Sequence, residues 1–315
     1  MKNLIVSSSP HIGTKTTTQS IMRDVLIALS PATVAGIVFF GWQALITILV
    51  CVGSAVACEF LFNLAVKKKQ TVNDLSAVVT GLLLALTLPT TAEIWHCIVG
   101  SAFAIVVVKC LFGGIGCNFA NPAIAARVLL VTSFSAAVAT GPRTAYQPEV
   151  DAIASASPLA IIKSGADVTL PSITDMLIGN RGGAIGETCI IALLLGFIYL
   201  LVRKVISWHV PVIYIGSVYI LSFILEGDPM TALYQILGGG LFLGAIFMAT
   251  DYVTTPINKG GKMVFALGCG LLTVLIRMGK YPEGVSFAIL IMNILAPYIE
   301  KLCAPKPFGK VGKKR

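Results

Sequence analysis

Ten long apolar stretches follow one another along the chain, and they constrain the fold more than any single motif does. A helix needs about 20 predominantly apolar residues to cross a bilayer. Charged residues make up only 12% of the 315 residues, against roughly 25% in soluble domains, so they could not cover a soluble fold. We therefore predict an all-α membrane protein with about ten transmembrane helices. The stretches run approximately over residues 22–41, 43–66, 74–89, 94–112, 122–140, 184–206, 209–226, 232–249, 262–278 and 283–301.

The basic residues predict how these helices are oriented. With a cytoplasmic N-terminus, most of the 23 Lys and Arg residues fall on the inner side, as the positive-inside rule requires. Both termini are then cytoplasmic, and the polar segment 1–21 has no features of a cleavable signal peptide. The net charge of +9 is scattered between apolar runs, including the basic tail 302–315. This distribution argues against a nucleic-acid partner and favours contact with anionic membrane lipid.

The chain also resembles itself at a fixed offset. Lys109 aligns with Arg277 and Gly116 with Gly284, and the same offset of 168 residues superposes the fourth apolar stretch on the ninth. Five stretches separate the two copies, so the copies would insert with opposite orientations, as in many transporter folds. We predict two inverted five-helix repeats, 22–140 and 184–301. An inverted copy of the inner Lys109 would also explain why Arg277 falls outside, against the charge rule.

Two segments with apolar flanks are dense in polar residues and end in Pro: 113–122, which also contains three Gly residues, and 248–256. Unpaired backbone groups near a membrane must be satisfied by protein, water or a ligand. The segments are therefore candidate linings of a central site, to which Asn118 and Asn121 would contribute side-chain amides. Simple tight turns between helices would account for them equally well.

Four acids lie within or beside the apolar stretches, where ionisable groups are costly and often functional. They are Glu59, Asp74, Glu187 and Asp251. Solvation at helix ends is the alternative interpretation. Asp251, with Thr254 nearby, is the strongest candidate for an ion path or a flavin site.

The connection 141–183 lies outside in this topology and is long enough to suggest a function. It contains the run Glu149-Val-Asp-Ala-Ile-Ala-Ser-Ala-Ser-Pro-Leu-Ala160, in which two carboxylates precede two serines. Taken alone, such a run is typical of an ordinary Ser/Pro loop or of a helix N-cap.

Several segments together resemble the NqrB/RnfD family, which includes the D subunits of Rnf complexes. The resemblance extends over nearly the whole chain. It rests on Ser9-Pro-His-Ile-Gly13, Met22-Arg-Asp-Val-Leu-Ile-Ala-Leu-Ser-Pro31, Asp74-Leu-Ser-Ala-Val-Val-Thr-Gly-Leu-Leu-Leu-Ala-Leu-Thr-Leu-Pro89, the Gly-rich segment ending at Asn118 to Asn121, and Thr250-Asp-Tyr-Val-Thr-Thr-Pro256.

The resemblance implies a covalently bound FMN in the outer loop. In this family the FMN phosphate is joined to a Thr hydroxyl in an Asp-Gly-x-Ser-Gly-Ala-Thr type sequence. Asp151, Ala156 and Pro158 match that pattern, and Ser157 stands where the Thr belongs. Serine offers the same kind of hydroxyl, so the resemblance implies a phosphoester at Ser157, with Asp151 as a recognition element for a flavin transferase. Attachment at Ser155, or none, is the alternative.

The resemblance further implies a subunit of an ion-translocating ferredoxin:NAD oxidoreductase in the cytoplasmic membrane, coupled to Na+ or H+. A second, noncovalent flavin, riboflavin, is compatible with it. The eight cysteines and three histidines show no metal-ligand spacing, so iron-sulfur, NAD and ferredoxin sites are expected in partner subunits. A stand-alone channel or transporter with the same inverted repeat, and a membrane scaffold, are the alternatives, and neither requires the Asp151 to Ala160 sequence.

Overall fold

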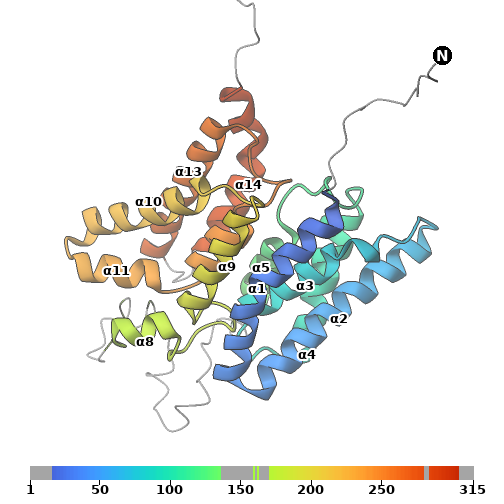
Figure 1. The fold of residues 1–315 in the computed structure, drawn as a ribbon, viewed down its shortest axis with the longest axis horizontal. Helices are drawn as coiled ribbons and strands as arrows, with labels where there is room; N and C mark the ends of the chain where they lie inside the picture. The colour runs from blue at the N-terminus through green and yellow to red at the C-terminus, as the bar shows by residue number, and fades with distance from the viewer. Residues whose placement is uncertain (1–15, 136–158, 160–161, 163–169, 280–283, 305–315) are drawn as a thin grey trace, which may run out of the picture.

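The chain folds into helices throughout the part that the structure describes, and no β-strand occurs there (Figure 1). The computed structural model describes residues 16–135, 159, 162, 170–279 and 284–304. Within these ranges the all-α prediction is confirmed.

The helices fall into two groups along the sequence. The first group is α1 (Thr18–Phe40), α2 (Trp42–Ala65), the 3-10 turn η1 (Val72–Asp74), α3 (Ser76–Thr87), α4 (Ile94–Ala102), the π-helical η2 (Phe103–Cys110) and α5 (Pro122–Ser133). The second group is α8 (Ile173–Ile178), α9 (Ile190–Val202), α10 (His209–Glu226), α11 (Pro229–Leu237), α12 (Leu241–Leu243), the π-helical η3 (Gly244–Met248), α13 (Lys259–Met278) and α14 (Val285–Leu302).

Each of the ten apolar stretches contains a helix, but not every helix is long enough to cross a bilayer alone. Five described helices are long and apolar enough: α1, α2, α10, α13 and α14. The pair Pro229–Leu237 and Leu241–Met248 is bent by 61° and makes a sixth if it counts as one broken span. These helices make the chain a multi-pass membrane protein. The other four apolar helices, at α3, α4 with η2, α5 and α9, have between 10 and 17 residues.

The shorter helices end where the backbone cannot continue. The helix α3 ends at Thr87, and its C-cap Leu88 is extended because the ring of Pro89 disfavours helical backbone in the preceding residue. The helix α5 starts at Pro122, the position where a missing N–H costs nothing. Both helices are shorter than the apolar stretches that contain them, because α3 ends before Pro89 and α5 ends at Ser133.

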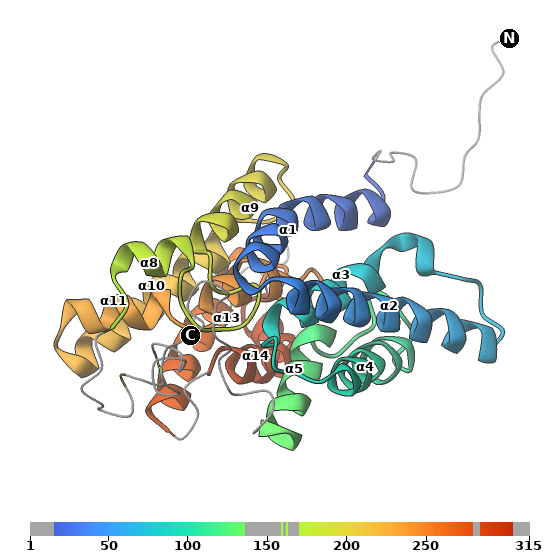
Figure 2. The same cartoon turned by 90° about the horizontal axis from the view of Figure 1, so that it is seen from below.

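The two groups pack internally and against each other. The helix α2 lies against α3 and α4, and α10 lies against α11 and α13. Across the two groups, α1 packs on α9 and α5 packs on α14 (Figures 1 and 2). In Figure 1, α2 to α4 lie to the right, and α8, α10 and α11 to the left, with α1 and α9 side by side near the middle.

Small residues allow the closest helix contacts. A Cβ added to Gly196 of α9 would lie 2.2 Å from the Ala28 carbonyl oxygen of α1. A Cβ added to Gly81 of α3 would lie 2.8 Å from the Cys51 carbonyl oxygen of α2. Such close backbone approach is typical of helices that associate within membranes.

Candidate functional site

The two polar segments 113–122 and 248–256 meet at one cavity. The cavity has a volume of about 330 Å³ and is mostly apolar. Asn118, Asn121 and Asp251 line it, together with side chains of α1, α3, η3 and the connection after α9. Small-molecule sites in proteins have volumes of roughly 300–1,000 Å³, apolar walls and a few polar groups. The cavity has these properties.

Asn121 joins the two segments. Its side-chain oxygen accepts hydrogen bonds from the backbone N–H groups of Ala123 (3.1 Å) and Ile124 (3.4 Å), so it caps the N-terminus of α5. Its amide nitrogen donates to the carbonyl oxygen of Met248, at 3.4 Å, at the end of η3. A single buried amide therefore satisfies backbone groups of both breaks, as a protein interior in a membrane requires.

Asn293 of α14 adds a second connection. With its amide oriented to suit its neighbours, its nitrogen donates to the Thr254 carbonyl oxygen (3.2 Å) and its oxygen accepts from the Asn121 backbone N–H (3.1 Å). Asn293 was not predicted from the sequence, although an Asn inside an otherwise apolar helix is a detectable signal.

Thr254 positions Asp251 and does not line the cavity itself. The buried Thr254 hydroxyl donates to Asp251 Oδ2 at 3.2 Å. Burial raises the pKa of the Asp251 carboxyl, and hydrogen bonds from the Val253 backbone and the Thr254 hydroxyl partly oppose this shift. The carboxyl therefore keeps its proton to a higher pH than an exposed Asp does, and can donate a hydrogen bond when neutral.

Glycines shape the wall formed by 113–117. Gly113, Gly114 and Gly116 have φ values of 123°, 98° and 90°, which residues with a Cβ rarely adopt. They turn the chain away from η2 and bring Ile115 and Gly116 to the cavity. Of the three glycines, Gly116 lines the cavity, and its backbone forms part of the wall there.

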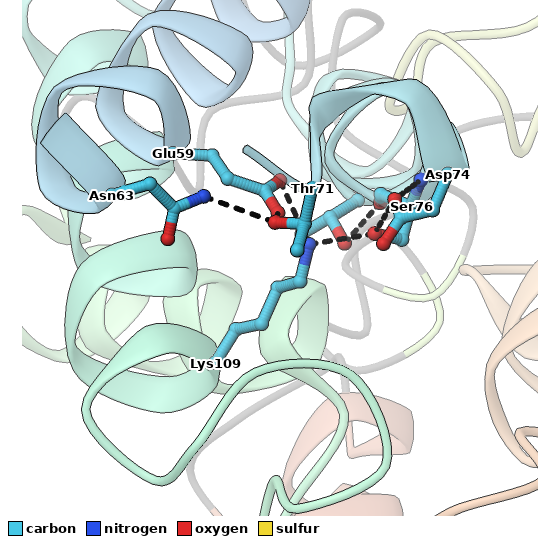
Figure 3. Close-up of polar contacts among 7 residues, drawn as sticks. Glu59, Asn63, Thr71, Asp74, Ser76 and Lys109 are labelled. Atoms are coloured by element: carbon cyan, nitrogen blue, oxygen red, sulfur yellow. Dashed lines mark hydrogen bonds and ion pairs between the residues drawn. The ribbon is translucent and has the colours of Figure 1, made fainter. Parts of the chain in front are cut away.

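A buried charge network borders the same cavity (Figure 3). Lys109 of η2 lies with its Nζ 2.8 Å from Glu59 Oε2 and 2.6 Å from Ser76 Oγ. Both Lys109 and Ser76 line the cavity. The Asp74 carboxylate accepts hydrogen bonds from the Ser76 backbone N–H (2.8 Å) and from its hydroxyl.

Glu59 does not reach solvent at a helix end. Its side chain is 1% exposed and is paired with Lys109, so the alternative of simple interfacial solvation is wrong for this acid. Among the four acids considered from sequence, Glu59 and Asp74 belong to this network, and Asp251 lines the cavity. The role of Lys109 was not predicted, although a Lys within an apolar run is itself unusual.

Glu187 belongs to a different cluster, near the break between α11 and α12. Its backbone carbonyl accepts from Arg181 Nη2 at 2.7 Å, and its Oε1 accepts from the Ala184 N–H at 2.9 Å. Arg277 donates to the carbonyl oxygen of Gln235 at 2.5 Å, in the last turn of α11 before the same break.

The predicted flavin-attachment residues Ser157, Asp151, Ser155, Ala156 and Pro158 lie outside the described residues. Leu159, which follows them in the sequence, is described and is 4% exposed. It packs against Gly238 and Gly239 at the break between α11 and α12, where a Cβ on either glycine would lie 2.9 Å from it.

The structure thus defines a multi-pass, helical membrane protein whose helix breaks surround an apolar cavity with buried polar groups. The family model described as NQR2, RnfD, RnfE family matches residues 5–309. The chain belongs to this family.

Similar proteins match nearly the whole chain. It is 47% identical over 98% of its length to the D subunit of the Na(+)-translocating ferredoxin:NAD(+) oxidoreductase complex of Acetobacterium woodii, 96% of which is covered. It is 40% identical over 98% of its length to the D subunit of the proton-translocating ferredoxin:NAD(+) oxidoreductase complex of Clostridium ljungdahlii, 97% covered. A further relative, 34% identical, is the D subunit of the ion-translocating oxidoreductase complex of Methanosarcina acetivorans, with 99% of each chain covered.

Proposed function

We propose that the chain is the flavin-carrying membrane subunit of an ion-translocating ferredoxin:NAD oxidoreductase, working with the other subunits of an Rnf complex. The observation that carries this proposal is the full-length match to D subunits of such complexes. The cavity lined by Asn118, Asn121 and Asp251 supports a bound cofactor within this subunit. The relatives are named for Na+ in one case and for protons in the other, so the proposal extends to either ion.

The proposed topology has ten crossings in two inverted repeats, in the cytoplasmic membrane, with both termini cytoplasmic. Two helix contacts support this topology. The helix α1 packs on α9, and α5 packs on α14, and each pair would be equivalent elements of the two repeats. The repeat partners Lys109 and Arg277 are both buried at the end of equivalent helices. Lys109 donates to the Ser76 hydroxyl at the start of the short helix α3. Arg277 donates to the Gln235 carbonyl oxygen near the end of the short helix α11.

A covalent FMN on the outer loop is part of the proposal, with Ser157 as its attachment residue. Its support is the sequence pattern around Asp151 and Ser157. Leu159, which follows the pattern in the sequence, is buried at the α11–α12 break. Maturation would then require a flavin transferase that recognises this loop.

Denaturing electrophoresis followed by peptide mapping tests the attachment. We expect a fluorescent band at about the chain mass of 33.2 kDa, with the adduct on the 144–163 peptide. Ser157→Ala should abolish the fluorescence, and the matched control Ser155→Ala should keep it. Fluorescence that persists in Ser157→Ala and disappears in Ser155→Ala would assign the attachment to Ser155 instead. A wild-type band without fluorescence would refute covalent binding.

A noncovalent flavin in the cavity is the second part of the proposal. A flavin supplies one-electron and two-electron redox chemistry, while the protein supplies position and electrostatics. Apolar side chains such as Leu83 and Phe247 would exclude water from its ring system. The Asn118 amide donates one hydrogen bond to the Ala120 carbonyl oxygen at 3.0 Å, which leaves its oxygen to accept from a ligand. Asp251 offers a polar group from the opposite segment.

Extraction of noncovalent flavin from the purified complex tests this part. Asp251→Leu removes a polar cavity group without affecting the attachment loop, and we expect the extracted flavin to fall while covalent fluorescence stays. Asp175→Leu, in the half-buried first turn of α8, replaces a carboxylate that does not line the cavity, and as a matched control it should leave both flavins unchanged. The absence of noncovalent flavin from this subunit in the wild-type complex would refute the assignment of the cavity as a flavin site. Unchanged flavin content and unchanged redox-driven transport in Asp251→Leu would show that Asp251 is not part of that site.

A further inference from the structure

Lys109 brings a buried positive charge to the wall of the cavity. The side chain is 4% exposed, and its ammonium is held by Glu59 and by the Ser76 hydroxyl (Figure 3). Lys109 and Ser76 line the cavity, whereas Glu59 does not. The positive end of the ion pair is therefore the end that a cavity ligand would meet.

Glu59 is fixed on the side away from the cavity. Its Oε1 accepts a hydrogen bond from the Thr71 hydroxyl at 2.6 Å, and Thr71 in turn accepts from the Asn63 amide at 3.0 Å. These contacts anchor the carboxylate to α2 and to the turn before α3. Lys109 is consequently positioned by a carboxylate that cannot easily follow it into the cavity.

The ammonium of Lys109 has donor capacity left for a ligand. An ammonium carries three N–H donors, and two of them have partners within the described chain, Glu59 and Ser76. Lys109 also lies in the last turn of the π-helical η2, and π-helical turns are rare and occur frequently at functional sites. The third donor is available to a group bound in the cavity.

The turn that carries Ser76 is conformationally unusual as well. Leu75 has a φ of 64°, a left-handed conformation that is an outlier for a bulky side chain. This turn places Asp74 where it accepts from the Ser76 N–H and hydroxyl. Ser76 is thereby oriented with its oxygen toward Lys109, which adds a second fixed contact to the ammonium.

We propose that Lys109, positioned by Glu59 and Ser76, is the fixed cation that stabilises the negative charge of a reduced flavin in this cavity. The inference rests on the proposed noncovalent flavin. A flavin bound there would gain the one electron that a one-electron donor of the complex loses, and no covalent bond would form or break. The added negative charge then faces an ammonium that is already in place, and such preorganised charges act strongly where water is excluded.

Redox titration of the purified complex tests the sign of the effect. Lys109→Met removes the cation at similar length, so the reduced flavin should lose at least tenfold in relative stability. This loss corresponds to a midpoint potential about 59 mV lower for a one-electron couple. Glu59→Gln leaves the cation without its carboxylate and should shift the same potential upward. Lys109→Arg keeps the charge and should stay closer to wild type than Lys109→Met does.

The controls separate electrostatics from folding. The double variant Glu59→Gln/Lys109→Met removes both buried charges, so it should assemble even if a single variant does not. Its midpoint potential should still be lower than that of wild type, because Lys109, the charge nearer to the cavity, is absent. Arg203→Gln removes a positive charge that is paired with Asp24 and is 51% exposed, so it should leave the potential unchanged.

Each outcome decides the inference. Opposite shifts in Lys109→Met and Glu59→Gln, with flavin content retained, support it. Equal or absent shifts with flavin retained overturn it while leaving the proposed flavin site intact. Flavin lost from Lys109→Met but kept by Lys109→Arg would make the cation a binding group and would also overturn the inference. Wild-type complex without a noncovalent flavin would instead refute the proposed function on which the inference rests.

Discussion

Replacing Gly196 with Ala tests the contact between α1 and α9, which joins the two groups of helices. The new Cβ would lie 2.2 Å from the Ala28 carbonyl oxygen and 3.0 Å from Phe247 Cζ. Ordinary contact begins at 3.4 Å, so the helices must separate locally by about 1.2 Å. The nearest atom belongs to the backbone of α1 and cannot rotate away, so α1 itself must move.

Gly216→Ala on α10 provides the matched control, because a Cβ there meets nothing within 4 Å. Both substitutions gain roughly 1 kcal/mol of intrinsic helix propensity. Only Gly196→Ala also suffers overpacking, which typically costs about 1–3 kcal/mol. We therefore expect Gly216→Ala to be neutral or slightly stabilising, and Gly196→Ala to be less stable than it by about 1–3 kcal/mol.

The assay is equilibrium unfolding of the detergent-solubilised protein, followed by far-UV circular dichroism during a denaturant titration. Because Phe247 lines the cavity, the purified complex carrying Gly196→Ala should also retain less noncovalent flavin than the complex carrying Gly216→Ala. Equal unfolding free energies for the two variants would refute the close contact between α1 and α9, and with it the packing of the two helix groups described above.

Three further predictions concern polar groups. Asn121→Ala should lower the unfolding free energy by about 0.5–2 kcal/mol, the usual cost of losing a helix N-cap, and an unchanged thermal midpoint would contradict this role. Glu59→Gln and Lys109→Met should each lower the free energy of unfolding by about 3–5 kcal/mol, because each leaves a buried charge unpaired. The double variant should lower it far less, because no buried charge is then left unpaired. Additive losses in a double-mutant cycle would contradict the pairing. At Asp228, hydrogen bonds from the Thr231 hydroxyl and backbone lower the carboxyl pKa from its ordinary 3.8. The ionised Asp228 therefore stabilises the fold above about pH 4, and this stabilisation is lost as the pH falls through the lowered folded pKa. A stability difference between wild type and Asp228→Asn that grows on acidification would contradict this assignment.

Local sequence signals determined which parts of the chain are helical and where the helices break. Each apolar stretch contains a helix, because apolar residues in a long run favour helical backbone in a membrane. The break at 113–122 follows from its Gly and Pro residues, which act on their own residue and its neighbours. Segment 248–256 is marked by its polar residues and by Pro256. Asn118, Asn121 and Asp251 were identifiable as candidates for the same reason, since each lies in a break that local composition marks.

Only the tertiary structure decided which of these elements come together. Lys109 and Glu59 are 50 positions apart and belong to different helices, so no periodicity along the chain could pair them. The Asn121 amide reaches Met248, 127 positions away, and the α1–α9 contact depends on the absence of a side chain at Gly196. Pairing of distant side chains is set by packing of whole helices, and that packing depends on shape complementarity between surfaces that the linear sequence does not place side by side.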